Sequence, residues 1–114
     1  MSRSRSSAAP KLAEAAPVFA ALGDETRLKL VARLCTSGPQ SIVRLTHGAK
    51  VSRQAITKHL RALEKAGLAR GSRAGRECTW ELQTMRLSQA QKYLDEISRQ
   101  WDAAIARLCK FVER

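Results

Sequence analysis

The segment from Ser52 to Gly67, "SRQAITKHLRALEKAG", most constrains what this chain can fold into. Serine is a favoured residue type at helix N-caps, and glycine commonly ends a helix just past its last turn. Between these two signals, apolar side chains recur at helical spacing: Ile56, Leu60 and Leu63. The segment therefore predicts a helix over 53–66 whose apolar face packs on a core.

The opposite face of this predicted helix is polar and basic. At ~100° per residue it carries Gln54, Lys58, Arg61 and Lys65, with Thr57 beside them and Ser52 and Arg53 at the N-terminal end. Arginine and lysine donate to guanine, glutamine pairs with adenine, and a helix N-terminus attracts phosphate. Many helices show such a face to water alone, so the neighbouring segments decide its role.

Those neighbouring segments predict a helix-turn-helix. Ser41 is an N-cap candidate for a short helix over 42–48, which Gly48 closes. A connection of three residues, 49–51, then leads to the helix described above. A short helix, a tight turn and a longer helix form the helix-turn-helix pattern, which favours DNA binding by the basic face.

Two further helices are predicted upstream, over 12–22 and 25–36. Gly23 ends the first, and Asp24 is a suitable N-cap for the second. Pro17 indicates a start or a kink within the first helix. The inward face of the second helix is expected to carry four residues: Leu28, Val31, Leu34 and Cys35.

Downstream of Gly67 the apolar period changes to two. Cys78, Trp80 and Leu82 alternate with polar residues, which is typical of a half-buried strand. Residues 68–82 therefore predict a β-hairpin that turns at Ala74-Gly75. The basic residues on and near its tip are Arg70, Arg73 and Arg76.

The last predicted helix covers 86–112 and carries one continuous apolar stripe. Its members are Leu94, Ile97, Trp101, Ile105, Leu108 and Val112. At ~1.5 Å per residue this helix is roughly 40 Å long. A core of this size does not cover so long a stripe, so we expect a second subunit to bury the remainder.

Charge and hydropathy bound the class of protein. Lys and Arg number 21 against 10 Asp and Glu, a formal net charge of +11, which favours nucleic acid as partner and an anionic membrane surface second. No apolar run approaches the ~18 residues of a membrane span. The start of the chain has no apolar signal region. We expect 1–11 to be a flexible basic tail and 12–114 to be the DNA-binding domain.

Two stretches resemble the ArsR-type winged-helix transcriptional repressors of bacteria and archaea. They are "LGDETRLKLVARLCTSGPQSI" and "VSRQAITKHLRALEKAGLARGSRAGRECTWEL", and the likeness covers roughly 18–82. The resemblance implies a mainly α winged helix-turn-helix with a small β-hairpin. It also implies a homodimer formed through the first and last helices, with the fourth helix in the major groove of double-stranded DNA and the wing on backbone or minor groove.

The resemblance assigns DNA contacts to the fourth helix and to Arg73 and Arg76 of the wing. Together with the basic face and hairpin tip, the predicted set is Ser52, Arg53, Gln54, Thr57, Lys58, Arg61, Arg70, Arg73 and Arg76. A dimer of this kind would repress by occupying an inverted repeat whose half-sites lie about one helical turn (~34 Å) apart, or a multiple of it.

No metal site or cofactor is expected, and the last helix, "YLDEISRQWDAAIARLCKFVE", resembles that of the non-metal branch of the family. Some members of the family bind metal through Cys on the third helix, but "SIVRLTHGA" has none. Others use Asp and His on the last helices. Here that helix has carboxylates but no His: Asp95, Glu96, Asp102 and Glu113. The sequence does not identify an effector.

The three cysteines are an odd number at wide spacing, so we expect a reducing cytoplasm and no disulfide framework. Cys35 and Cys78 are expected to point inward. Cys109 is the best candidate for a redox switch, because Arg107 and Lys110 can lower its thiol pKa. For the histidines, His59 is expected to pack and hydrogen-bond and His47 to cap a helix at the surface.

Two alternatives remain open at this level. One is a thiol- or metal-responsive repressor of the same fold, and the other is a small basic RNA-binding protein. RNA modules stack bases on aromatic side chains, whereas this chain has two Trp, two Phe and one Tyr, and its Trp residues are expected to be buried. No nucleophile–base pair, phosphate loop or metal set indicates an enzyme.

Overall fold

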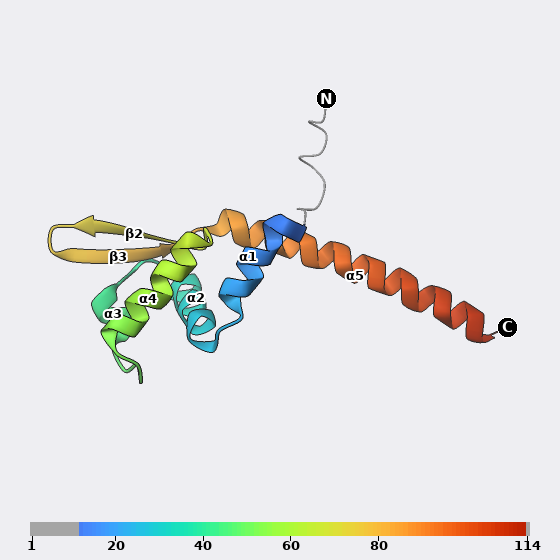
Figure 1. Ribbon diagram of the computed structural model, residues 1–114, viewed down its shortest axis with the longest axis horizontal. Helices are drawn as coiled ribbons and strands as arrows, with labels where there is room; N and C mark the ends of the chain where they lie inside the picture. Colours follow the sequence, from blue (N-terminus) through green and yellow to red (C-terminus); the bar gives the residue numbers. More distant parts are fainter. Residues whose placement is uncertain (1–11, 114) are drawn as a thin grey trace, which may run out of the picture.

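In the computed structural model, which describes residues 12–113, the chain folds into five helices and three strands (Figure 1). In chain order they are α1 (Leu12–Leu22), α2 (Glu25–Ser37), β1 (Gln40–Ser41), α3 (Ile42–Thr46), α4 (Arg53–Lys65), β2 (Ala69–Ala74), β3 (Glu77–Leu82) and α5 (Thr84–Glu113). The predicted mainly α fold with a β-hairpin wing is confirmed. Within the described residues, no helix is long and apolar enough to cross a membrane.

The wing is a three-stranded antiparallel sheet in the order β1-β3-β2. The hairpin turns at Gly75, whose φ of +64° suits glycine. A side chain at Gly71 would lie 3.0 Å from the Trp80 ring, so glycine is needed where the two strands pair. The sequence did not predict β1, because its two residues are too short to show alternation.

The core lies between the first four helices and the sheet. Its largest fully buried side chains are Leu45, Leu60, Leu63 and Leu68. Trp80 is also buried and packs from the wing into the same cluster. The hairpin is therefore attached to the helical core at its base.

The predicted inward face of α2 is partly wrong. Leu30, Val31 and Leu34 are buried, whereas Leu28 is 52% exposed and Cys35 is also exposed. All five residues lie on one broad apolar face of α2, so their spacing alone did not show which part of that face is buried. Packing against α4 and β3 buries the part that carries Leu30.

Helix ends follow the predicted caps closely. Asp24 caps α2 by accepting the Arg27 amide at 3.0 Å. α1 has the predicted bounds, 12–22, and continues through Pro17, so of the two alternatives at Pro17 a helix start is wrong. α3 ends at Thr46, before the predicted 48, and the chain then turns at Gly48 with a φ of +75°.

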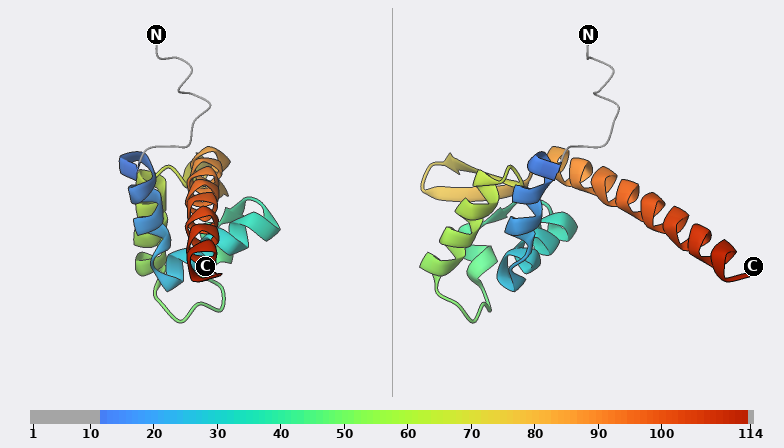
Figure 2. Two further views of the ribbon diagram at one scale, coloured as in Figure 1. Left: turned by 90° about the vertical axis from the view of Figure 1, so that its right-hand side faces the viewer. Right: turned by 45° about the vertical axis from the view of Figure 1, so that its right-hand side comes forward.

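α5 leaves the core and extends away from it (Figure 2). Its first half packs on α1, where Ala90 is buried and the rings of Phe19 and Tyr93 lie 6.1 Å apart. The radius of gyration is 18.6 Å, whereas a compact domain of this length has about 13 Å. Trp101 is 66% exposed in this single chain, so the expectation that both Trp residues are buried is wrong.

Candidate nucleic-acid interface

The candidate interface begins at the N-terminus of α4. Ser52 has extended backbone angles (φ −71°, ψ 161°), and its hydroxyl accepts the Ala55 amide at 3.1 Å. The cap satisfies one of the free N–H groups of the first turn and fixes where the helix starts. Arg53 and Gln54 therefore emerge from the exposed first turn of α4.

The inner face of α4 holds the helix against the core. Ile56, Leu60 and Leu63 are each 0–2% exposed. These three side chains fix the rotation of the helix about its axis. The opposite face is thereby turned to solvent, as the sequence predicts.

His59 adds a polar contact between α4 and the start of α2. Its Nδ1 lies 3.3 Å from Arg27 Nη1 and 3.7 Å from Asp24 Oδ2. Because arginine only donates, Nδ1 accepts this hydrogen bond when the ring is neutral. The prediction that His59 packs and hydrogen-bonds is confirmed, and the contact ties α4 to the α2 cap.

The same contact perturbs Asp24. The backbone N–H of Arg27 donates to its carboxylate and holds the pKa of Asp24 below its ordinary value, with smaller contributions from the charges of His59 and Arg27. The carboxylate therefore stays ionised at neutral pH. It keeps both the cap of α2 and the link to His59.

The outer face of α4 carries the predicted DNA-contacting side chains. Ser52, Arg53, Gln54, Lys58 and Arg61 are exposed, and Thr57 is half-buried between them. Most of these residues line one shallow depression along the helix. The structure therefore places the predicted residues of α4 side by side on an open surface.

Arg73 of the wing joins this surface. A groove between α4 and the hairpin is lined by Arg53, Thr57 and Arg61 from the helix and by Arg73 and Cys78 from the strands. Three guanidinium groups thus surround one groove, which suits a phosphate. Cys78 is half-buried there, as its alternation predicts.

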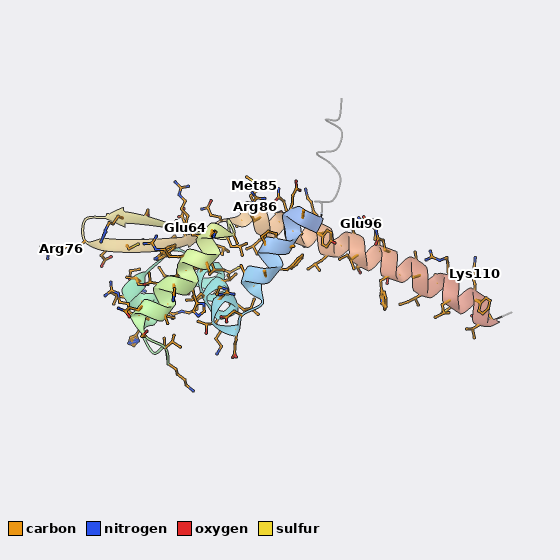
Figure 3. All side chains as sticks on the ribbon, viewed as in Figure 1. Glu64, Arg76, Met85, Arg86, Glu96 and Lys110 are labelled. Atoms are coloured by element: carbon orange, nitrogen blue, oxygen red, sulfur yellow. The ribbon has the colours of Figure 1, made fainter. Side chains whose placement is uncertain are left out.

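The other two predicted arginines of the wing lie elsewhere. Arg76 sits at the hairpin tip, far from the helices (Figure 3). Arg70 is exposed on β2 and, because successive residues of a strand face opposite sides, it points away from the face of Arg73. The structure therefore does not bring Arg70 together with the Arg73 groove.

Glu64 is a residue at this site that the sequence reading missed. Its Oε2 accepts the Gly71 amide at 3.4 Å, and its Oε1 lies 3.7 Å from Arg61 Nη1. Figure 3 shows it at the end of α4 beside the wing. The sequence signal that could have identified Glu64 is that it is the single carboxylate in a basic helix. Glu64 links α4 to β2 and positions Arg61.

The remaining cysteines lie outside this interface. Cys35 on α2 and Cys109 on α5 are exposed, which corrects the inward orientation predicted for Cys35. Across residues 12–113, no three His, Cys, Asp or Glu side chains gather as metal ligands.

Comparisons with known proteins agree with this geometry. The family described as a helix-turn-helix domain matches residues 22–71. An uncharacterized HTH-type transcriptional regulator of Methanocaldococcus jannaschii is 30% identical over 90 residues, which cover 76% of this chain and 98% of the relative. A crystal structure of an ArsR family transcriptional regulator aligns with a TM-score of 0.74 at 26% identity, over 82% of this chain and 96% of the other.

A further solved structure is more similar in sequence. It is an ArsR-like transcriptional regulator from a Rhodococcus species, with a TM-score of 0.73 and 38% identity. The match covers 87% of this chain and 92% of that one. The likeness therefore extends over most of both chains.

Proposed function

Because the chain belongs to the ArsR-type family of winged helix-turn-helix transcriptional regulators, we propose that it is a homodimeric repressor that binds an inverted-repeat operator. The observation that carries this proposal is the exposed basic face of α4, held outward by the buried Ile56, Leu60 and Leu63. The family relationship makes the chain a transcriptional regulator. Repression, dimerisation and the operator symmetry are our inference.

In this proposal α4 enters the major groove. Gln54 and Lys58 lie on the exposed face and contact base edges, while Ser52 and Arg53 at the N-terminus contact phosphate. Thr57 lies between the two sets and touches either. Base contacts supply sequence preference, and phosphate contacts fix the position of the helix.

The wing supplies further phosphate contacts. Arg73 shares a groove with Arg53 and Arg61, so one backbone phosphate can bind between helix and hairpin. Arg76 at the tip reaches the neighbouring backbone or minor groove. Arg70, on the other strand face, acts through the general positive field.

Dimerisation supplies the second half-site. The apolar stripe of α5 is exposed, whereas Ala90 is buried and Tyr93 packs on Phe19 of α1. A second copy that covers α5 and α1 would bury this stripe and place two α4 helices on one face of the DNA. The unit 12–114 then acts as the dimeric DNA-binding domain at the nucleoid. The predicted tail, 1–11, lies outside the described residues.

The proposal is tested on the DNA upstream of the gene that encodes this chain. We expect nuclease footprinting to show a protected inverted repeat, with affinity that falls steeply as salt rises because phosphate contacts release counterions. Transcription from that promoter should decrease when protein is added. Equal competition by random RNA would contradict the proposal and favour an RNA-binding protein.

Two variants separate base reading from phosphate binding. We expect Gln54→Ala to reduce discrimination between the operator and single-base variants by about 5- to 150-fold, or ~1–3 kcal/mol. Arg73→Ala should weaken binding to all sequences alike and lower the salt slope by about one. Quantitative gel-shift titrations at several salt concentrations measure both effects. The reverse pattern would show that the groove assignment is wrong.

A further inference from the structure

A cavity of about 310 Å³ lies between α2 and the turn that precedes α4, on the side of α4 that carries Ile56. Three buried core side chains form its apolar floor: Leu30, Leu45 and Ile56. Its volume lies at the lower end of the ~300–1,000 Å³ typical of small-molecule sites. The DNA-facing residues Gln54 and Lys58 are not among its lining, so the cavity is separate from the interface.

The rim of this cavity is cationic. Its charged or titratable lining residues are Lys29, Arg33, His47 and Lys50, and no carboxylate is among the lining residues. Lys29 pairs with Glu25 at 3.1 Å on the exposed side of α2. Among residues 12–113, Lys50 forms no ion pair. The rim therefore favours a negatively charged ligand.

Arg33 gives the rim a rigid donor. Its Nη1 donates to the Leu45 carbonyl at 3.2 Å and its Nη2 to the Arg44 carbonyl at 3.0 Å. A guanidinium has five N–H donors, so others remain for a ligand. Because both bonds go to the main chain of α3, the position of Arg33 is set by the fold.

The wall of the cavity is also the turn that positions α4. Gly48, Ala49 and Val51 line it directly before the Ser52 cap. Gly48 has a φ of +75°, and Val51 is 40% exposed. A ligand that contacts this turn and Ile56 together would therefore favour one arrangement of the first turn of α4.

We propose that this cavity binds a small organic anion, with a carboxylate or phosphate head on the cationic rim and a compact apolar body on the Leu30–Leu45–Ile56 floor. Its binding changes the affinity of α4 for DNA. This regulatory part depends on the proposed DNA-binding function, whereas binding of the anion does not.

Binding is measured first without DNA. Phenyl phosphate, benzoate and inorganic phosphate are titrated separately at constant ionic strength, and NMR shifts of backbone amides and methyl groups are followed. We expect saturable shifts at Ala49, Val51 and the Leu30 and Leu45 methyls. Phenyl phosphate should bind about tenfold more tightly than inorganic phosphate, because its ring leaves water.

A matched pair of variants tests the rim. Lys29→Gln/Lys50→Gln should weaken phenyl phosphate binding by about tenfold, whereas Lys92→Gln/Lys110→Gln removes the same charge from exposed positions on α5 and should leave it within about twofold. Equal losses in both variants would overturn the proposal in favour of general charge attraction. Non-saturable shifts, or shifts centred on Gln54, Lys58 and Arg61, would also overturn it.

The regulatory part is measured on the operator. We expect saturating phenyl phosphate to change the operator Kd of the wild type by about fivefold or more, and Lys29→Gln/Lys50→Gln to need about tenfold more phenyl phosphate for the same change. Saturable binding with no change in operator Kd would overturn the regulatory part. Absence of operator binding without any anion would instead count against the proposed function, so the two failures are distinguishable.

Discussion

α4 and the second half of α5 carry similar sequence patterns but meet opposite environments. In both helices apolar residues recur every three or four positions. In α4 these side chains, Ile56, Leu60 and Leu63, are 0–2% exposed. In the second half of α5 they are 44% exposed at Ile105 and 74% at Val112. The pattern shows that a face needs cover, but it does not show which element covers it.

The difference separates two roles. The apolar face of α4 is covered by its own chain, so its polar face is free for DNA. α5 runs beyond the core (Figure 1), and its apolar stripe from Leu94 to Val112 is exposed. Monomeric proteins rarely expose a contiguous apolar patch of this kind. We therefore expect α4 to contribute to the stability of the subunit and α5 to that of the assembly.

The largest expected effect is at the centre of the buried stripe. Leu60→Ala removes a fully buried side chain and should lower the free energy of unfolding by about 2–5 kcal/mol, because of lost burial and the cavity left behind. Urea unfolding followed by far-UV circular dichroism measures it. The loss should be the same at low and high protein concentration.

Leu108→Ala is the matched substitution on α5, where the side chain is 62% exposed. In the proposed dimer its partner surface lies on a second subunit, so its effect on unfolding should depend on protein concentration. If both variants lose the same free energy at every concentration, the contrast between the two helices disappears.

The next effect concerns the assembly itself. Trp101→Glu places a charge in the middle of the α5 stripe and should raise the dimer dissociation constant by about 100-fold or more, ~2.7 kcal/mol, because the charge loses water on burial. Sedimentation equilibrium measures the change.

Ala103→Glu serves as the control for this variant. It adds the same charge on the opposite, exposed side of α5 and should leave the dimer intact. A wild type that is monomeric at all accessible concentrations would show that α5 is not the dimer surface.

The smallest effect compares one carboxylate from each region. The pKa of Asp24 is lowered mainly by the Arg27 backbone amide, and that of Glu96 mainly by the Arg99 side chain. Since both folded pKa values lie below the ordinary ones, 3.8 for Asp24 and 4.5 for Glu96, each stabilisation is fully present only above the ordinary pKa and is lost as pH falls through the folded value.

We expect Asp24→Asn to lower stability at pH 7 and to lose this difference from the wild type below pH ~4. Glu96→Gln should change stability less at any pH, because its ion pair is solvent-exposed. Thermal melts between pH 2 and 7 measure both, and a larger effect at Glu96 would contradict this order.

The candidate DNA surface was largely predictable because one helix carries most of it. Ser52 caps α4, and Gln54, Lys58 and Arg61 are exposed as their spacing predicts. The wing was harder, because arginines close in sequence need not share a face. Arg73 reaches the groove, whereas Arg70 lies on the other side of β2.

Other features arise from contacts between distant segments. The bond from Gly71 to Glu64 joins the wing to α4, and the cavity needs α2 and the turn at Gly48 to meet. β1 is only a two-residue strand, and it exists because Gln40 pairs with Trp80. Contacts between distant segments leave no local sequence pattern, so the Glu64 bond, the cavity and β1 were not predicted from the sequence.

The sequence by itself determined the helices, their caps and the basic face of α4, because these depend on neighbours within about one turn of helix. Tertiary structure alone decided which edge of α2 is buried and how the wing meets α4. These outcomes depend on how much apolar area each distant element offers to another. That quantity exists only once the elements have packed.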